Sequence, residues 1–210
     1  MKKIDKKTLI ITSIVTLIPL VIGCILWEQL PDVIPTHFGM DGTPNGWSSK
    51  AFTVFGIPVL MTFFHLLCVG ITSQDPKYYN MSDKLYGLIV WLIPVISLLV
   101  VVSCYGGALG WNINISKYAV AGSGILFIII GNYLPKCKQN YTMGIKLPWT
   151  LDNEENWNKT HRLAGFLWVV GGLLIILNAF VGNEWVFVAI VLVMVLVPTV
   201  YSYLYFKKNK

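Results

Sequence analysis

The sequence predicts an all-α integral membrane protein: a six-transmembrane-helix bundle with both termini in the cytoplasm. Of its 210 residues, 55% are hydrophobic and 12% are charged, and the mean hydropathy is +0.65. A soluble domain carries about 25% charged residues, so this chain has too few charges to cover a surface that faces water. Its apolar residues also gather into six runs close to the length that spans a bilayer, which is about 20 residues for a helix.

The six runs define the predicted spans of one polytopic domain, residues 1–210. The first run is longer than a signal-peptide core of roughly 7–15 residues, so it predicts an uncleaved helix. Its segment Val21–Cys24 also fits a bacterial lipoprotein cleavage box, which leaves lipidation of Cys24 as an alternative. The turn 182–184 is so short that the last two spans must run antiparallel. The spans cover about 8–27, 51–73, 85–109, 118–134, 161–181 and 185–206.

Lysine and arginine predict the orientation of these spans. With the N-terminus inside, fourteen of the sixteen basic residues fall on the inner side, and only Lys50 and Lys117 fall outside. Cytoplasmic loops of membrane proteins accumulate these residues. We therefore expect cytoplasmic termini, a cytoplasmic motif loop 131–162 and an extracytoplasmic loop 28–50. The same bias accounts for the net charge of +6 without a nucleic-acid partner.

Titratable groups are scarce inside the predicted spans, and His65 is the one placed well within them. A neutral histidine that donates a hydrogen bond to a neighbouring helix is the favoured interpretation, with a proton relay as the alternative. Cys68 lies one helical turn away, but two ligands do not make a metal site. The four cysteines show no metal-ligand spacing, although Cys24 and Cys104 both fall near the outer face, where a bridge is an open option.

The outer loop 28–50 is rich in proline and glycine. Asp41-Gly42 and Asn45-Gly46 are turn dipeptides, and each proline forces extended backbone before it. An imidazole and aromatic rings on a stiff loop are suited to recognition of a peptide. Anchoring of Phe38 and Trp47 at the lipid headgroups is an equally good interpretation.

The central loop 131–162 holds five basic residues together with several prolines, glycines and tryptophans. Thr150 or Asp152 is a candidate N-cap for a short helix through Glu154 to Trp157, lying on the bilayer surface. Lys146 and Arg162 lie close in sequence to three carboxylates, which predicts an ion-pair network or a docking surface. These carboxylates belong to Asp152, Glu154 and Glu155.

Motifs of catalysis are not found in the sequence: it contains no nucleophile elbow, phosphate loop, zinc helix or carboxylate pair at catalytic spacing. We therefore expect no enzymatic activity, no cofactor and no metal.

Two motifs together resemble a known family. LPDVIPTHFGMDGTPNGWSSK, after the first span, is similar to the outer-loop signature of a widespread bacterial domain of unknown function. GNYLPKCKQNYTMGIKLPWTLDNEENWNKTHRLAG resembles the blocks GN-x-[ML]-P, G-I-R-[TL]-PWTL and W-x-x-TH-R of the SdpI-type immunity proteins. The resemblance covers nearly the whole chain. Its main departure is Lys146, where the family usually has arginine, which keeps the charge but loses bidentate geometry.

This resemblance implies a multi-pass protein of the bacterial plasma membrane that gives resistance to a secreted, membrane-active peptide toxin. It also implies a signal receptor that holds a cytoplasmic repressor at the membrane. The implied partners are the toxin, the repressor and the lipid bilayer. The residues expected to face the toxin are Asp32, Pro35, His37, Phe38, Gly42 and Trp47. Those expected in the cytoplasmic motif are Asn132, Pro135, Gly144, Lys146, Pro148, Trp149, Thr150, Trp157, His161 and Arg162.

Two other functions stay open at this point. A small transporter or exporter of peptide or lipid needs a polar pathway, which the scarcity of intramembrane charge disfavours. A structural subunit of a larger membrane complex would be recognised by its failure to purify alone.

Overall fold

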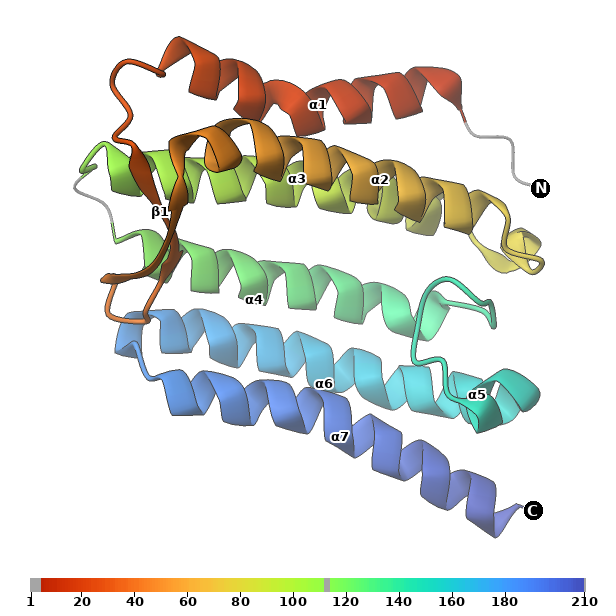
Figure 1. Ribbon diagram of the computed structural model, residues 1–210. Coiled ribbons are helices and arrows are strands. Elements are labelled where there is room, and N and C mark those ends of the chain that lie inside the picture. The colour runs from red at the N-terminus through yellow and green to blue at the C-terminus, as the bar shows by residue number, and fades with distance from the viewer. Residues whose placement is uncertain (1–4, 112–113, 210) are drawn as a thin grey trace. The chain divides into compact units, whose positions relative to one another are not determined.

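A computed structural model describes residues 5–111 and 114–209 (Figure 1). Within these residues, six helices are long and apolar enough to cross a membrane, as the sequence predicted. The chain is therefore a multi-pass membrane protein. Lys2, Lys3 and Lys210, which were counted in predicting the orientation, lie outside the described residues.

The six long helices follow the predicted spans with shifted ends. They are α1 (Lys6–Ile25), α2 (Ile57–Ser73), α3 (Asp83–Ala108), α4 (Ile115–Tyr133), α6 (Glu154–Val181) and α7 (Glu184–Lys208). Two short helical elements extend these spans, η1 (Phe52–Gly56) before α2 and η3 (Leu134–Lys136) after α4, and two others lie between spans, η2 (Tyr78–Asn80) and α5 (Pro148–Asp152). The π-helical η1 ends two residues before Pro58, a residue that cannot donate a backbone hydrogen bond to the helix.

The chain forms two compact units. Of the described residues, one unit contains 5–73, 86–111 and 114–119, and the other contains 74–85 and 120–209. In the first unit, the buried residues of α1 are Thr12, Thr16, Pro19 and Gly23, which form one stripe along the helix. The Ser97 hydroxyl on α3 donates to the Thr16 carbonyl at 3.0 Å, and the Tyr105 hydroxyl donates to the Pro19 carbonyl at 3.2 Å.

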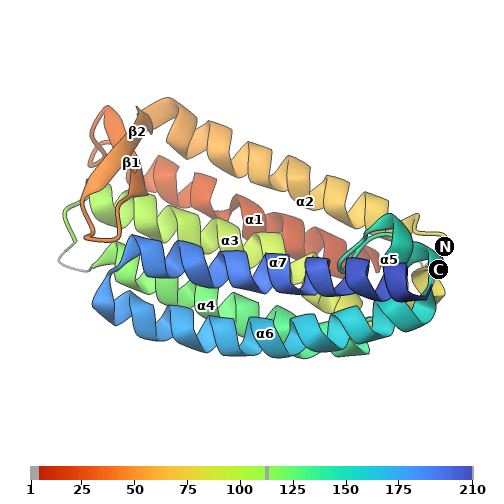
Figure 2. The same ribbon diagram turned by 90° about the horizontal axis from the view of Figure 1, so that it is seen from below.

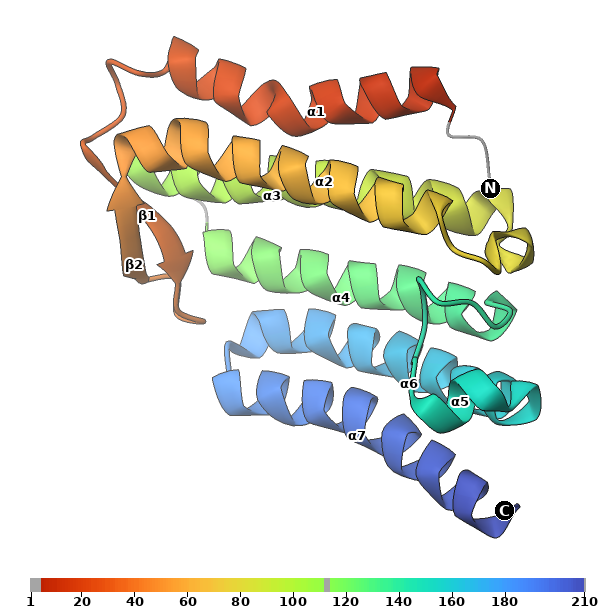
Figure 3. The same cartoon turned by 45° about the vertical axis from the view of Figure 1, so that its right-hand side comes forward.

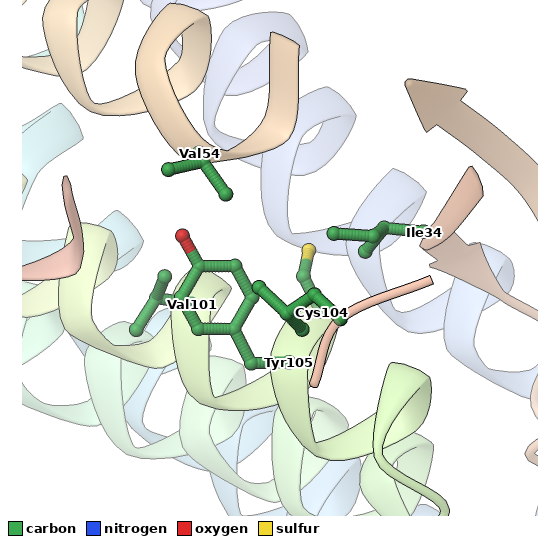
Figure 4. Packing of buried hydrophobic residues seen from close by; sticks show 6 residues of the cluster. Ile34, Val54, Val101, Cys104 and Tyr105 are labelled. Carbon is green, nitrogen blue, oxygen red and sulfur yellow. The ribbon is translucent and has the colours of Figure 1, made fainter. Parts of the chain in front are cut away.

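The apolar core of this unit surrounds Tyr105 (Figure 4). Val54 from η1, Val101 and Cys104 from α3, and Ile34 from the segment after α1 lie around the ring. A β-carbon at Gly23 would fall 2.3 Å from the Tyr105 hydroxyl, so only glycine allows α1 to approach here. All four cysteines are free, so the optional Cys24–Cys104 bridge is absent.

In the second unit, α6 and α7 run side by side (Figure 2) and are joined by the expected tight turn, in which Gly182 has a φ of 72°. Helix α4 also meets α6 through glycines. A β-carbon at Gly124 would lie 2.6 Å from the Gly172 carbonyl, and one at Gly131 would lie 3.0 Å from the Gly165 carbonyl. The two pairs are seven residues apart on each helix, so the backbones touch along two turns.

Two features differ from the sequence predictions. The loop after α1 contains an antiparallel β-hairpin of β1 (Val33–Phe38) and β2 (Pro44–Ser49), so the protein is not purely helical (Figure 3). The predicted surface helix capped by Thr150 or Asp152 is wrong. Asn153 caps α6, accepting from the Asn156 amide at 2.8 Å, and α6 continues without a break into the apolar span.

Candidate functional site

The central loop is fastened to the link between α2 and α3. Asp75 in that link is 4% exposed, and its carboxylate accepts from the Tyr141 amide at 2.9 Å and the Thr142 hydroxyl at 2.6 Å. Its other oxygen accepts from the Lys77 amide at 2.8 Å. These hydrogen bonds offset the loss of water contacts that burial imposes on the carboxylate. Asp75 therefore joins two segments that are far apart in the sequence.

Gln139 makes a second connection of the same kind. Its side-chain oxygen accepts from the Lys77 ammonium, and its backbone carbonyl accepts from the Asn80 side chain at 2.7 Å. Its side-chain amide donates to the carbonyls of Thr150 at 3.0 Å and Leu151 at 2.7 Å. Residues 74–80 and 137–161 thus form one hydrogen-bonded body, here called the central-loop module.

The neutral ring of His161 closes the loop against α6. Its Nδ1 lies 2.8 Å from the Trp157 carbonyl, which only accepts, so Nδ1 carries the proton. Its Nε2 then accepts the Ile145 amide at 2.9 Å. The ring stacks on Trp157 with centroids 4.0 Å apart, and the Trp157 indole donates to the Cys137 carbonyl at 2.7 Å. Gly144 passes directly over both rings with a φ of 117°.

Helix α5 ties the module to α7. The Thr150 hydroxyl accepts from the Leu147 amide at 2.9 Å, which fixes the start of α5. The Trp149 indole donates to the Ser202 hydroxyl at 3.0 Å, and its ring stacks on Phe206. Asn156 on α6 donates to the Ser202 carbonyl at 2.9 Å. Ser202 is therefore a shared attachment point for α5, α6 and α7.

Lys146 does not join the predicted ion-pair network. Its ammonium donates to the carbonyls of Tyr141 at 3.2 Å and Thr142 at 3.0 Å, so its charge serves the loop backbone. Lys159 instead pairs with Glu155 at 2.8 Å, one turn along α6.

The thiol of Cys137 is buried inside the central-loop module, and burial raises its pKa to about 11.

The predicted cytoplasmic residues fall into two groups. The structure buries Thr150, Trp157 and His161 together beside Gly144, within the module. Pro135 packs its ring on Gly165 of α6. Exposed positions are Asn132, Pro135, Lys146, Pro148 and Arg162, and Trp149 is half-buried. Sequence reasoning missed Asp75, Gln139 and Ser202, because none belongs to a motif and each acts through a partner distant in sequence.

In the other unit, the β-hairpin follows α1. Val33 pairs with Ser49 and Pro35 with Trp47, while bulges interrupt the register around His37. His37 Nδ1 is hydrogen-bonded to the Asn45 side chain across the strands. In the connecting turn Gly42 has a φ of 88°, and hydrogen bonds from the Thr43 hydroxyl and amide hold the pKa of Asp41 below its ordinary value.

The predicted toxin-facing residues also divide by direction. Phe38 points inward, since a β-carbon at Gly107 of α3 would lie 2.6 Å from its ring, and Pro35 is buried. The Ser116 hydroxyl on α4 donates to the Gly39 carbonyl at 2.6 Å. This hydrogen bond holds the turn of the hairpin against the start of α4, within the same unit. The exposed members of the predicted set are Asp32, His37 and Trp47.

His65 lies inside the same unit and makes the predicted contact with a neighbouring helix. Its Nε2 is 2.9 Å from the Thr12 hydroxyl of α1, which donates its own proton to the Thr8 carbonyl at 2.9 Å. Thr12 therefore accepts, and His65 Nε2 donates. The other ring nitrogen, Nδ1, is buried without a hydrogen-bond partner. In the described part of the chain, no three histidine, cysteine or acidic side chains come together as metal ligands would.

Comparison with known proteins places both loops in recognised families. Residues 136–202 match the SdpI/YfhL protein family, and residues 14–62 match a domain of unknown function, DUF1648. The chain is 30% identical over 206 residues to the immunity protein SdpI of Bacillus subtilis (strain 168). That alignment covers 95% of this chain and 96% of the relative. No solved structure matches the chain.

Proposed function

The chain belongs to the SdpI/YfhL protein family, and from this premise we propose that it protects a bacterial cell against a secreted, membrane-active peptide toxin. The observation that carries the proposal is the match to an immunity protein along almost the whole chain, including the β-hairpin and the central-loop module. The β-hairpin and the central-loop module suit binding better than catalysis, because neither contains a nucleophile paired with a base.

The proposed topology puts the β-hairpin outside the cell and both termini and the central-loop module inside. Fourteen of the sixteen basic residues then lie on the cytoplasmic side, which meets the positive-inside rule. The chain would reside in the plasma membrane, with the hairpin in position to meet a peptide that arrives from outside.

We propose further that the module transmits a signal by holding a cytoplasmic repressor while toxin is bound. This role is supported by two exposed basic residues, Lys146 in the module and Arg162 directly after it on α6, and by a module interior that is fixed by hydrogen bonds. A toxin can change the module only if it binds two states of the protein with different affinity. Deleting the gene in its host should abolish any toxin-dependent change in transcript levels, and Arg162→Ala should reduce that change while membrane abundance stays the same.

The test of immunity is survival of a toxin-sensitive bacterium that expresses the chain and is challenged with secreted antimicrobial peptides. We expect survival with the wild-type chain, and loss of survival with His37→Ala at unchanged membrane abundance. If no peptide is tolerated by cells that hold the protein in their membrane, the immunity proposal is wrong.

A further inference from the structure

One face of the β-hairpin is open and apolar. Cross-strand pairing puts Val33 beside Ser49 and Pro35 beside Trp47, and directly paired side chains share a face of the sheet. On this face Val33 is 57% exposed and Trp47 is 58% exposed, while Pro35, paired with Trp47, is buried. The opposite face carries Ile34, which is fully buried in the core of its unit. The hairpin is thus held from one side and presents tryptophan and valine on the other.

The charged residues of segment 28–50 are mostly acidic, although the whole chain has a net charge of +6. Glu28 and Asp32 precede β1 and Asp41 lies in the turn, and all three are exposed. The one lysine of this segment is occupied: the Lys50 ammonium donates to the Trp27 carbonyl at 3.3 Å and lies 5.0 Å from the Trp27 ring centre. It also pairs with Asp32 at 3.4 Å, with only 15% of its side chain exposed.

We propose that the open face of the hairpin, with Trp47 and Val33 at its centre and Glu28, Asp32 and Asp41 around it, binds a cationic amphipathic peptide. This inference rests on the proposed immunity function and specifies the chemistry of the toxin. The apolar side of such a peptide would cover the indole and the valine, where buried tryptophan supplies most binding energy. Its basic side chains would meet the three carboxylates, which speed the encounter and fix the orientation.

The same charges decide between a peptide and a lipid surface. Exposed carboxylates are repelled by anionic headgroups, and a membrane anchor of this kind normally combines aromatic residues with lysine or arginine. The hairpin has the aromatic residue but the opposite charge. A basic peptide is therefore the better occupant of this face.

Binding can be measured with the full-length chain in nanodiscs of phosphatidylcholine. The probe is a synthetic amphipathic helix of leucine and lysine, compared with the same helix carrying glutamate in place of lysine. We expect the lysine peptide to bind above the level of empty nanodiscs and the glutamate peptide not to. Raising the sodium chloride concentration should weaken binding of the lysine peptide.

Variants then assign the binding to the hairpin. The double variant Glu28→Gln/Asp32→Asn should bind roughly two- to thirtyfold more weakly, since each exposed ion pair contributes little, and should depend less on salt. Trp47→Ala should weaken binding by about tenfold or more. Trp111→Ala is the matched control, because Trp111 is 47% exposed in the same unit but its ring lies on Gly106. This variant should bind like the wild type.

Three outcomes overturn the inference: equal binding of both peptides, unchanged binding by the double variant, or equal losses from Trp47→Ala and Trp111→Ala. Trp47 fluorescence is obtained as the difference between the wild type and Trp47→Ala. If brominated lipid quenches it in the absence of peptide, the face is a lipid anchor and the inference is also overturned. If the chain protects cells from the toxin but does not bind the lysine peptide, the proposed cationic peptide is refuted and the immunity proposal stands. A chain that passes the peptide test but protects no cell refutes the immunity proposal.

Discussion

Gly144 is the position where one methyl group should do most damage to the central-loop module. Its φ of 117° is a conformation that alanine adopts only under strain, at about 1–3 kcal/mol. The added β-carbon would lie 2.3 Å from His161 Nε2 and 3.0 Å from the Trp157 ring. Both rings are buried, so they cannot move aside, and such overpacking costs about 1–3 kcal/mol more. Gly144→Ala should therefore destabilise the module by about 2–6 kcal/mol.

Gly110→Ala is the control for backbone strain at a positive-φ glycine outside the module. Gly110 also has a positive φ, 67°, but no atom lies within 4 Å of a β-carbon built there. Its replacement should cost only the backbone strain, about 1–2 kcal/mol. Because Gly110 lies in the other unit, this strain should not open the module.

Limited trypsin digestion in detergent is the assay, because Lys138 and Lys146 lie in the loop that Gly144 closes. When opening is fast compared with cleavage, the cleavage rate follows the population of the open form. A loss of 2 kcal/mol should therefore raise cleavage at these sites by about thirtyfold. Gly110→Ala should leave it at the wild-type rate. If Gly144→Ala is cut no faster than Gly110→Ala, the packing of this loop against His161 is not as described.

Three further predictions concern the helices and the buried thiol. Gly172→Ala would put a methyl group 2.5 Å from a carbonyl of α4 and should lower the melting temperature by several degrees. Gly87→Ala, where a β-carbon would have no atom within 4 Å, should not lower it. Equal melting temperatures of the two variants would disprove the contact. Thr12→Val leaves His65 Nε2–H without an acceptor and should cost about 1–3 kcal/mol in detergent unfolding, most of it recovered by adding His65→Leu; a fully additive loss would contradict this pairing. Burial raises the pKa of Cys137 to about 11, so Cys137 should stay a neutral thiol at pH 8. Mass spectrometry should show that iodoacetamide alkylates it far more slowly in the folded chain than in sodium dodecyl sulfate. Rapid alkylation of the folded chain would show that the thiol is accessible.

The spans were predictable because one physical requirement, a bilayer-long apolar helix, appears directly as a run of apolar residues. The hairpin was not, although its turn dipeptides were seen. Pro35 and Pro44 interrupt the alternation that marks a strand, and the bulges around His37 shift it. Of the two turn dipeptides, Asp41-Gly42 does lie in the turn, where the Gly39 amide donates to the Thr43 carbonyl at 2.9 Å, whereas Asn45-Gly46 lies within β2.

The central-loop module shows a different limit of sequence reasoning. Asp75 lies in a short link with no motif, and its partners Tyr141 and Thr142 lie more than sixty residues away. Only tertiary structure brings them together. The start of α6 was misplaced for a local reason, since Asn153 is as good a cap as Thr150 or Asp152 and the pattern of apolar residues does not choose among them.

The family signature contains both buried and exposed residues, and we expect the two groups to have different roles. Gly144, Thr150, Trp157 and His161 bind one another and the loop backbone, so their first task is to give the module its shape. Arg162 has no such position inside the module, since it is exposed on α6.

The same division holds in the hairpin, where Phe38 packs on Gly107 while His37 and Trp47 are exposed. A motif therefore identifies the scaffold more readily than the surface that binds. Substitutions at buried signature positions should lower stability together with function, whereas those at Arg162 or Trp47 should change function in a protein that is still folded. Specific tests of recognition belong at the exposed positions, with abundance in the membrane as the measure that separates the two effects.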